Sequence, residues 1–381
     1  MSENSRFLQA FTHRLLSIAT LGALASPLFT AAVGCGGKVV VDGGEGGAGG
    51  STASLSSLSG SSTITKCFDW GTYTDCPTGD EAYQNLTLNC GEEISGSPDF
   101  VDGQCCYLVN ITGSCGIAGR PFFVEHRART AEVRRGGSGR SWASAPQLPD
   151  VTALSAADRA TLAAAWLADA RMEHASVASF ARFSLDLLAV GAPADLVAAA
   201  HEAALDEVRH ARLCFALASA YAGETLAPEP FPFGGAITLA SDLAAMASAA
   251  VREGCIGETL AALQAAEQLA HATDPAVRAV LTTIAEDEAA HAELAWRTVV
   301  WALAQGGEPV RRAVTAAFAD LDSVVAAAAP ARTSAALAAH GRPDPLALHA
   351  TLHRSLDNVI GLCARTMLGA PPAALLAASA S

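Results

Sequence analysis

The chain has 381 residues, of which 51% are hydrophobic, and 38 acidic against 24 basic side chains give it a formal net charge of −14. This length is enough for one large domain with smaller appendages. The acidic balance argues against nucleic acid as a partner, because phosphate binding requires a basic surface.

The N-terminal 35 residues have the pattern of an export signal. Basic residues precede an apolar run, rich in small side chains, that extends from Leu15 to Gly34. The sequence Ala32-Val33-Gly34-Cys35 resembles a bacterial lipoprotein processing site, which implies cleavage before Cys35 and lipidation of that residue. We therefore expect residues 1–35 to be a signal peptide and the mature chain to be an extracytoplasmic, membrane-anchored lipoprotein. A secreted protein and an uncleaved membrane anchor are the alternatives.

A tether and a disulfide module are expected after Cys35. Residues 36–65 are dominated by Gly and Ser, the composition of a flexible linker. Residues 66–120 contain six cysteines, and such a count in a short segment of an exported chain indicates disulfides whose pairing stays open. The candidates are Cys67, Cys76, Cys90, Cys105, Cys106 and Cys115. A zinc site is the alternative, but the spacing Cys-x-x-Cys does not occur.

Residues 121–150 have the composition of a basic connector, and the rest of the chain predicts helices. Helix-start signals occur at Ser155 and at Asp274-Pro275, and Gly306-Gly307 is a stop signal. We expect four long helices within residues 151–305, at 156–190, 194–221, 237–272 and 275–305. Two further helices are expected within residues 306–381, at 308–328 and 345–368. Long helices joined by short loops predict an all-α four-helix bundle with two extra C-terminal helices.

A five-residue motif occurs twice in the predicted helices. Asp206-Glu207-Val208-Arg209-His210 returns as Asp287-Glu288-Ala289-Ala290-His291. Glu173 precedes Glu207 by 34 residues, and Glu253 precedes Glu288 by 35. One Glu from each of two helices and Glu-x-x-His from each of two others form the ligand set of a two-metal site in a helix bundle.

Helix geometry places these side chains on common faces. Residues three apart project from one side of a helix, so each Glu faces the same site as the His that follows it. Mixed oxygen and nitrogen ligation suits two iron ions, with manganese possible and zinc an alternative on ligand type. Glu258 competes with Glu253 as the third-helix ligand, since the two lie about 140° apart on a helix and both cannot face the site. The repeat spacing favours Glu253.

The helical region resembles the ferritin-like superfamily of di-iron carboxylate proteins over roughly residues 150–305. The first motif matches the Asp-Glu-x-Arg-His pattern of bacterial multicomponent monooxygenase hydroxylases, whereas the second has Ala290 in place of Arg. The resemblance implies that each motif Glu bridges the metals and each His binds one of them. It also implies that Asp206 orients His291 and that Asp287 orients His210.

The resemblance further implies oxygen-dependent oxidoreductase chemistry of the oxidase, hydroxylase or ferroxidase type. The substrate, a small molecule, is not indicated by the sequence, and the electron donor would be a separate partner. The alternative is a non-enzymatic surface lipoprotein that keeps the metal for stability or binds a partner through its Cys-rich module.

Overall fold

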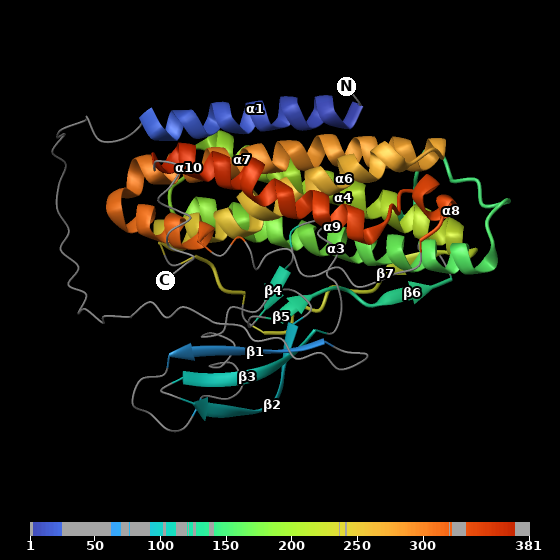
Figure 1. Cartoon of the computed structure of the whole chain (residues 1–381), viewed down its shortest axis with the longest axis horizontal. Helices are drawn as coiled ribbons and strands as arrows, with labels where there is room; N and C mark the ends of the chain where they lie inside the picture. Colours follow the sequence, from blue (N-terminus) through green and yellow to red (C-terminus); the bar gives the residue numbers. More distant parts are fainter. Residues whose placement is uncertain are drawn as a thin grey trace. The chain divides into compact units, whose positions relative to one another are not determined.

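A computed structural model gives the architecture of the chain (Figure 1). The chain divides into a helical unit of residues 1–26, 116–124 and 129–381 and a smaller unit of residues 27–115 and 125–128. The residues that the structure describes are 3–24, 62–69, 76, 92–101, 104–111, 120, 122–124, 127–136, 141–235, 237–240, 242–319, 321 and 333–369.

The smaller unit contains a three-stranded antiparallel sheet. Its strands are β1 (Ser62–Asp69), β2 (Glu92–Val101) and β3 (Gln104–Ile111), and β3 lies between the other two. The Cys-rich segment therefore contains strands, so the chain is mostly helical but not purely so.

Two disulfides hold this sheet. Cys67 and Cys106 lie directly opposite each other on β1 and β3 and are bonded, and Cys76 is bonded to Cys105. The other candidates, Cys90 and Cys115, lie outside the described residues. Because disulfides persist where the redox environment is oxidising, these two bonds indicate an extracytoplasmic setting.

The helical unit contains long helices close to those expected. The first are α3 (Ala156–Ala189) and α4 (Ala194–Ala222), which pack against each other. Next come α5 (Leu243–Ala249), the π-helical segment η2 (Ala250–Glu258) and α6 (Thr259–His271), which follow one another along the chain and pack against α7 (Pro275–Phe318). The third expected helix thus begins at residue 243 rather than 237 and is not a regular α-helix throughout.

Local sequence explains where these helices begin and end. The Ser155 hydroxyl accepts a hydrogen bond from the Asp158 N–H at 3.0 Å, and the Asp274 side chain caps α7 in the same way. Gly223 ends α4 with a φ of 74°, in the left-handed region that glycine adopts most easily. Gly307, at φ 59°, breaks the helical path inside α7 where the stop signal was expected.

The C-terminal region forms shorter helices than expected. The segment predicted as one helix over 345–368 consists of α9 (Pro345–Ser355), the π-helical η4 (Leu356–Gly361) and α10 (Leu362–Leu368), preceded by α8 (Ala335–Ala339). The helix expected over 308–328 continues as α7 to Phe318, and most of its remainder lies outside the described residues.

The predicted connector is partly ordered into strands. These are β4 (Phe122–Val124), β5 (Arg127–Arg129) and β6 (Val133–Arg135), and β6 pairs antiparallel with β7 (Leu226–Pro228). Residues 116–124 belong to the helical unit, so the structural boundary lies before residue 120.

The residues read as a signal peptide begin with a helix that packs on the helical unit. This helix, α1 (Glu3–Leu24), lies against α6, α7 and α10. Phe11, Leu15 and Ala19 are completely buried there, and Arg14 forms a 3.1 Å ion pair with Glu293. Cys35, the expected lipidation site, lies outside the described residues. Among the described helices, none combines the length and apolar character needed to cross a membrane.

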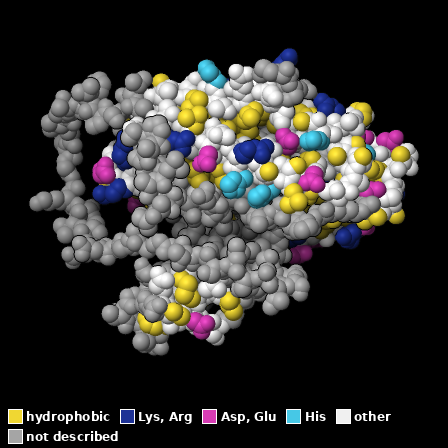
Figure 2. Space-filling model, in the orientation of Figure 1, with side chains coloured by type: hydrophobic (Ala, Val, Ile, Leu, Met, Phe, Trp, Pro, Cys, Tyr) yellow, Lys and Arg dark blue, Asp and Glu magenta, His cyan; other side chains and the backbone are white. Residues whose placement is uncertain are grey.

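Two apolar clusters fill the helical unit. Along α4 the chain passes from Ala203 in one cluster to Leu213 in the other, and along α7 it passes from Ile284 back to Leu294. The repeated motifs lie between these residues on both helices. Acidic and basic side chains are interspersed over the visible described surface (Figure 2), whereas the motif Glu and His side chains are buried.

If α1 belongs to the mature fold, Leu15→Ala should lower the free energy of unfolding by about 2–5 kcal/mol, the usual cost of removing a buried Leu side chain. Leu21→Ala is the matched control, because Leu21 is on the same helix and 62% exposed. Thermal melts of the full chain would measure both. Equal melting temperatures would show that α1 is not part of the stable fold, as a removable export signal requires.

Candidate metal centre

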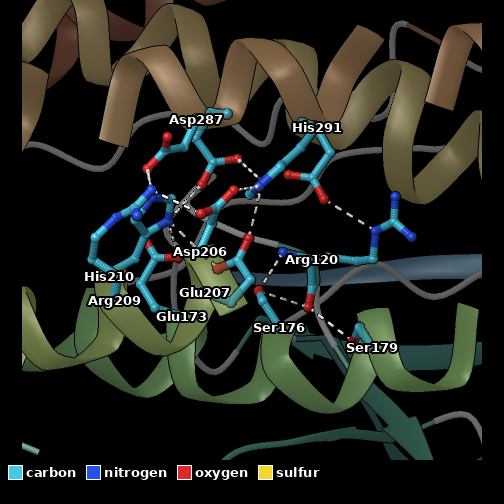
Figure 3. Close-up of polar contacts among 12 residues, drawn as sticks. Arg120, Glu173, Ser176, Ser179, Asp206, Glu207, Arg209, His210, Asp287 and His291 are labelled. Atoms are coloured by element: carbon cyan, nitrogen blue, oxygen red, sulfur yellow. Dashed lines mark hydrogen bonds and ion pairs between the residues drawn. The ribbon is translucent and has the colours of Figure 1, made fainter. Parts of the chain in front are cut away.

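Six ionisable side chains from four segments converge inside the helical unit (Figure 3). They are Glu173 from α3, Glu207 and His210 from α4, Glu258 from the end of η2, and Glu288 and His291 from α7. Each is at most 2% exposed. They form two groups that could each hold a metal ion, with ligand atoms within 4.8 Å of one another.

The two groups share their central carboxylates. The first, called here the Glu173 group, consists of Glu173, Glu207, His210 and Glu288. The second, called the Glu258 group, consists of Glu207, Glu258, Glu288 and His291. Because the motif glutamates occur in both groups, they are placed to bridge two cations, while each group has its own terminal Glu and its own His.

The histidine Nδ1 atoms point toward these carboxylates. His210 Nδ1 lies 3.4 Å from Glu288 Oε1 and 3.7 Å from the nearest oxygens of Glu173 and Glu207. His291 Nδ1 lies 3.2 Å from Glu207 Oε1 and 3.6 Å from Glu288 Oε2. Each imidazole therefore faces oxygens contributed by both motifs.

The structure corrects the expectation for the third helix. Glu253, which the repeat spacing favoured, lies away from the cluster, is ion-paired with Arg182, and has a side chain that is 17% exposed. Glu258 is completely buried and belongs to the cluster instead. The alternative that the sequence left open is therefore the arrangement observed.

The π-helical segment η2 is the physical reason for this difference. Its i→i+5 hydrogen bonds place more residues in each turn than an α-helix does, so the repeat spacing, on which the choice of Glu253 rested, does not identify which glutamate faces the site. A signal was present in the sequence, since Gly254 and Gly257 both lie between the two glutamates and glycine disfavours regular helix.

Two aspartates contact the histidines at Nε2, the ring nitrogen that faces away from the glutamates. His210 Nε2 lies 2.9 Å from Asp287 Oδ2, and His291 Nε2 lies 3.4 Å from Asp206 Oδ2. This is the crosswise arrangement that the resemblance implied. With the Nε2 proton directed at a carboxylate, Nδ1 is the ring atom available to a metal.

A single arginine serves both aspartates. Arg209 donates to Asp206 at 2.8 Å and to Asp287 at 2.5 Å. Burial raises the pKa of Asp287, but hydrogen bonds from His210 and Arg209 outweigh it and the pKa is lowered. Arg209 thus reaches across to α7, whose own motif has Ala290 where the first motif has Arg209.

The cluster contains several buried polar atoms without a hydrogen-bond partner among the described residues. The side-chain oxygens and nitrogens in it that have no hydrogen-bond partner are Glu173 Oε2, both oxygens of Glu207, His210 Nδ1, Glu258 Oε2, both oxygens of Glu288 and His291 Nδ1. Unpaired carboxylates in a protein interior cost several kcal/mol each unless a cation or proton compensates them. The donor set and these free lone pairs therefore fit a pair of metal ions.

The pKa shifts reflect the same crowding. Burial and neighbouring carboxylates raise the pKa of Glu173 and of Glu258 well above the ordinary value. Burial acts against charge on His210 and His291 too, but contacts with carboxylates outweigh it and raise both histidine pKa values. These shifts favour a proton on Glu173, Glu258 and both imidazoles.

Asp287→Asn should weaken metal binding about 10–100-fold, because it removes the charge that orients His210 and supports its basicity. Asp195→Asn is the matched control. Asp195 is an exposed aspartate on α4 that forms an ion pair with Arg297 on α7, so its contact also joins the two helices that carry the motifs. Titration with Mn²⁺ would measure both. An equal loss in the two variants would contradict a specific role for Asp287.

Comparison with known proteins gives no match: no family model, no curated protein and no solved structure is similar enough to the chain to be recognised as related. The assignment of the site therefore depends on its geometry, which shows a helical protein with a buried cluster of Glu and His that could hold metal.

Proposed function

We propose that the helical unit is a ferritin-like bundle that binds two metal ions and catalyses an oxygen-dependent oxidation of a small molecule outside the cytoplasm. The observation that carries this proposal is the pair of overlapping ligand groups with two shared carboxylates. Each of the two imidazoles is oriented by an aspartate on the opposite motif helix.

The ligand chemistry supports iron, with manganese as the second choice. Four carboxylates and two imidazoles provide mixed oxygen and nitrogen donors without thiolate. The buried cysteines near the ligands in sequence, Cys214 and Cys255, are not in either group. A structural zinc site usually has four ligands to one ion, whereas here Glu207 and Glu288 each belong to both ligand groups.

The residues of the chain have separate tasks at such a centre. Glu207 and Glu288 would bridge the two ions, while Glu173 and Glu258 would each complete one position. Asp206 and Asp287 would keep the imidazoles in one orientation. A pair of redox-active ions supplies the electrons that oxygen chemistry requires, and the surrounding apolar clusters exclude water from the site.

A small cavity adjoins two of the candidate ligands. Glu173 and Glu288 line it together with the polar side chains of Asp169, Gln264 and Gln268. This cavity would let a small reactant approach the carboxylates from inside the bundle. Asp169 is itself paired with Arg342 at 2.6 Å, which closes that flank.

We further propose that the chain is exported and anchored through Cys35. The two disulfides support an oxidising compartment. The Gly/Ser-rich residues after Cys35 would separate the membrane from the folded units. Cleavage before Cys35 would remove α1, so its packing on α7 and α10 belongs to the unprocessed chain in this scheme.

The test of the proposed function is metal analysis and oxygen reaction of the full chain. Reconstituted wild type should hold about two irons per chain and, once reduced, should develop new near-ultraviolet absorbance on exposure to oxygen. Glu207→Ala and Glu288→Ala should each lose both properties, because each residue belongs to both ligand groups. Glu253→Ala is the matched control and should retain them.

Other outcomes have clear meanings. Two bound metals without reaction with oxygen would favour the alternative, a non-enzymatic surface protein that keeps the metal for stability. Loss of iron in Glu253→Ala but not in Glu258→Ala would contradict the ligand assignment. Wild type without stoichiometric metal would refute the dinuclear centre.

A further inference from the structure

A buried arginine from outside the long helices reaches the cluster. Arg120 precedes β4, is completely buried, and donates from Nε to Glu258 Oε1 at 3.0 Å (Figure 3). Its backbone is fixed as well, because its N–H donates to Ser176 Oγ at 2.6 Å and its carbonyl accepts from Ser179 Oγ at 3.0 Å. Arg120 is therefore held at two points on α3 while its side chain points to a candidate ligand.

The surrounding residues form a fitted space for the guanidinium. Its carbon lies 4.3 Å from the centre of the Phe180 ring and 4.8 Å from that of Phe183. Glycine at residue 254 provides the space for the guanidinium. A Cβ at Gly254 would lie 2.9 Å from Arg120 Nη2 and 2.3 Å from the Ala295 Cβ. Both Nη atoms are buried without a hydrogen-bond partner, so the described polar contact of this charge is with Glu258.

Such a pair requires an explanation beyond stability. A completely buried ion pair seldom stabilises a fold more than apolar side chains of the same volume would, because both charges lose their hydration. Here the arginine also lies beside a carboxylate that belongs to a metal-binding group and has one buried oxygen, Glu258 Oε2, without a hydrogen-bond partner. Its position suggests an effect on the metal centre.

Arg120 makes the two ligand groups unequal. They share Glu207 and Glu288 and have equivalent histidines, but the terminal Glu258 is bound to a guanidinium and the terminal Glu173 is not. A divalent ion in the Glu258 group would share its ligand with Arg120 and lie close to a fixed positive charge. An ion in the Glu173 group would have neither disadvantage.

We propose that Arg120 is a positioning residue that acts as a built-in counter-cation for Glu258, so that the Glu173 group binds metal first and the Glu258 group binds it second and more weakly. This inference rests on the proposed two-metal centre. It assigns a direct influence on the metal site to the last residue of the segment predicted as the Cys-rich module.

Titration of the metal-free full chain with Mn²⁺ tests the proposal, with calorimetry for affinity and electron paramagnetic resonance for the coupling between neighbouring ions. Wild type should bind in two unequal steps, with the coupled signal confined to the second. In Arg120→Met the second step should tighten by roughly tenfold or more while the first stays unchanged, because a repelling charge is removed. Arg120→Lys keeps the charge and should keep two unequal steps.

Two further variants provide a control and a second test of the proposed binding order. Arg182→Met removes an arginine from Glu253, which is outside both groups, and should leave both steps unchanged. If Arg120→Met does not fold, Glu258→Gln remains decisive, since it should abolish the second step and retain the first at wild-type affinity. Loss of the first step in Glu258→Gln would overturn the proposed order.

The failures are distinguishable. Two equal steps in wild type, or an unchanged second step in folded Arg120→Met, would overturn the role of Arg120 and leave the two-metal centre intact. Wild type that binds no stoichiometric Mn²⁺ or iron would overturn the centre itself and this inference with it.

Discussion

The structure depends on the confinement of four carboxylates to one water-poor volume. Glu173, Glu207, Glu258 and Glu288 come from segments far apart in the sequence, yet their ligand atoms belong to groups within 4.8 Å. Apolar packing above and below the site keeps the helices together against this repulsion, since each motif lies between the two apolar clusters. Around the cluster, Asp206 and Asp287 contact the histidines, and Arg209 and Arg120 provide positive charge.

The aspartates and Arg209 show how the repeat is used. Asp206 contacts the histidine of the second motif and Asp287 contacts that of the first, so α4 and α7 are tied together at the height of the site. Arg209 joins both aspartates from one side. One arginine contacts both aspartates because the two motifs face each other, although the second motif has Ala290 in the equivalent position.

The sequence predicted the site better than it predicted the path of every helix. The two Glu-x-x-His motifs and Glu173 converge as their spacing indicated, because α3, α4 and α7 are regular helices where these residues lie. The third helix departed from expectation because a π-helical segment changes which face a residue occupies. Arg120 could not have been found from periodicity, since a single arginine at the end of the Cys-rich segment carries no helical pattern. The packing of α1 is likewise invisible in a run that also fits an export signal.

A chain exported before it binds metal must fold with the site unloaded, and the structure provides for that state. The pKa values of His210 and His291 are raised by contacts with carboxylates although burial opposes charge, and this favours protonated imidazoles in the metal-free protein. The pKa of Glu173 and of Glu258 is raised as well, chiefly by burial, which favours a proton on these groups. Arg120 supplies the permanent cation at the Glu258 end. Protons leave when a metal enters, but the guanidinium cannot, and this difference is what would make the two ends of the centre chemically distinct.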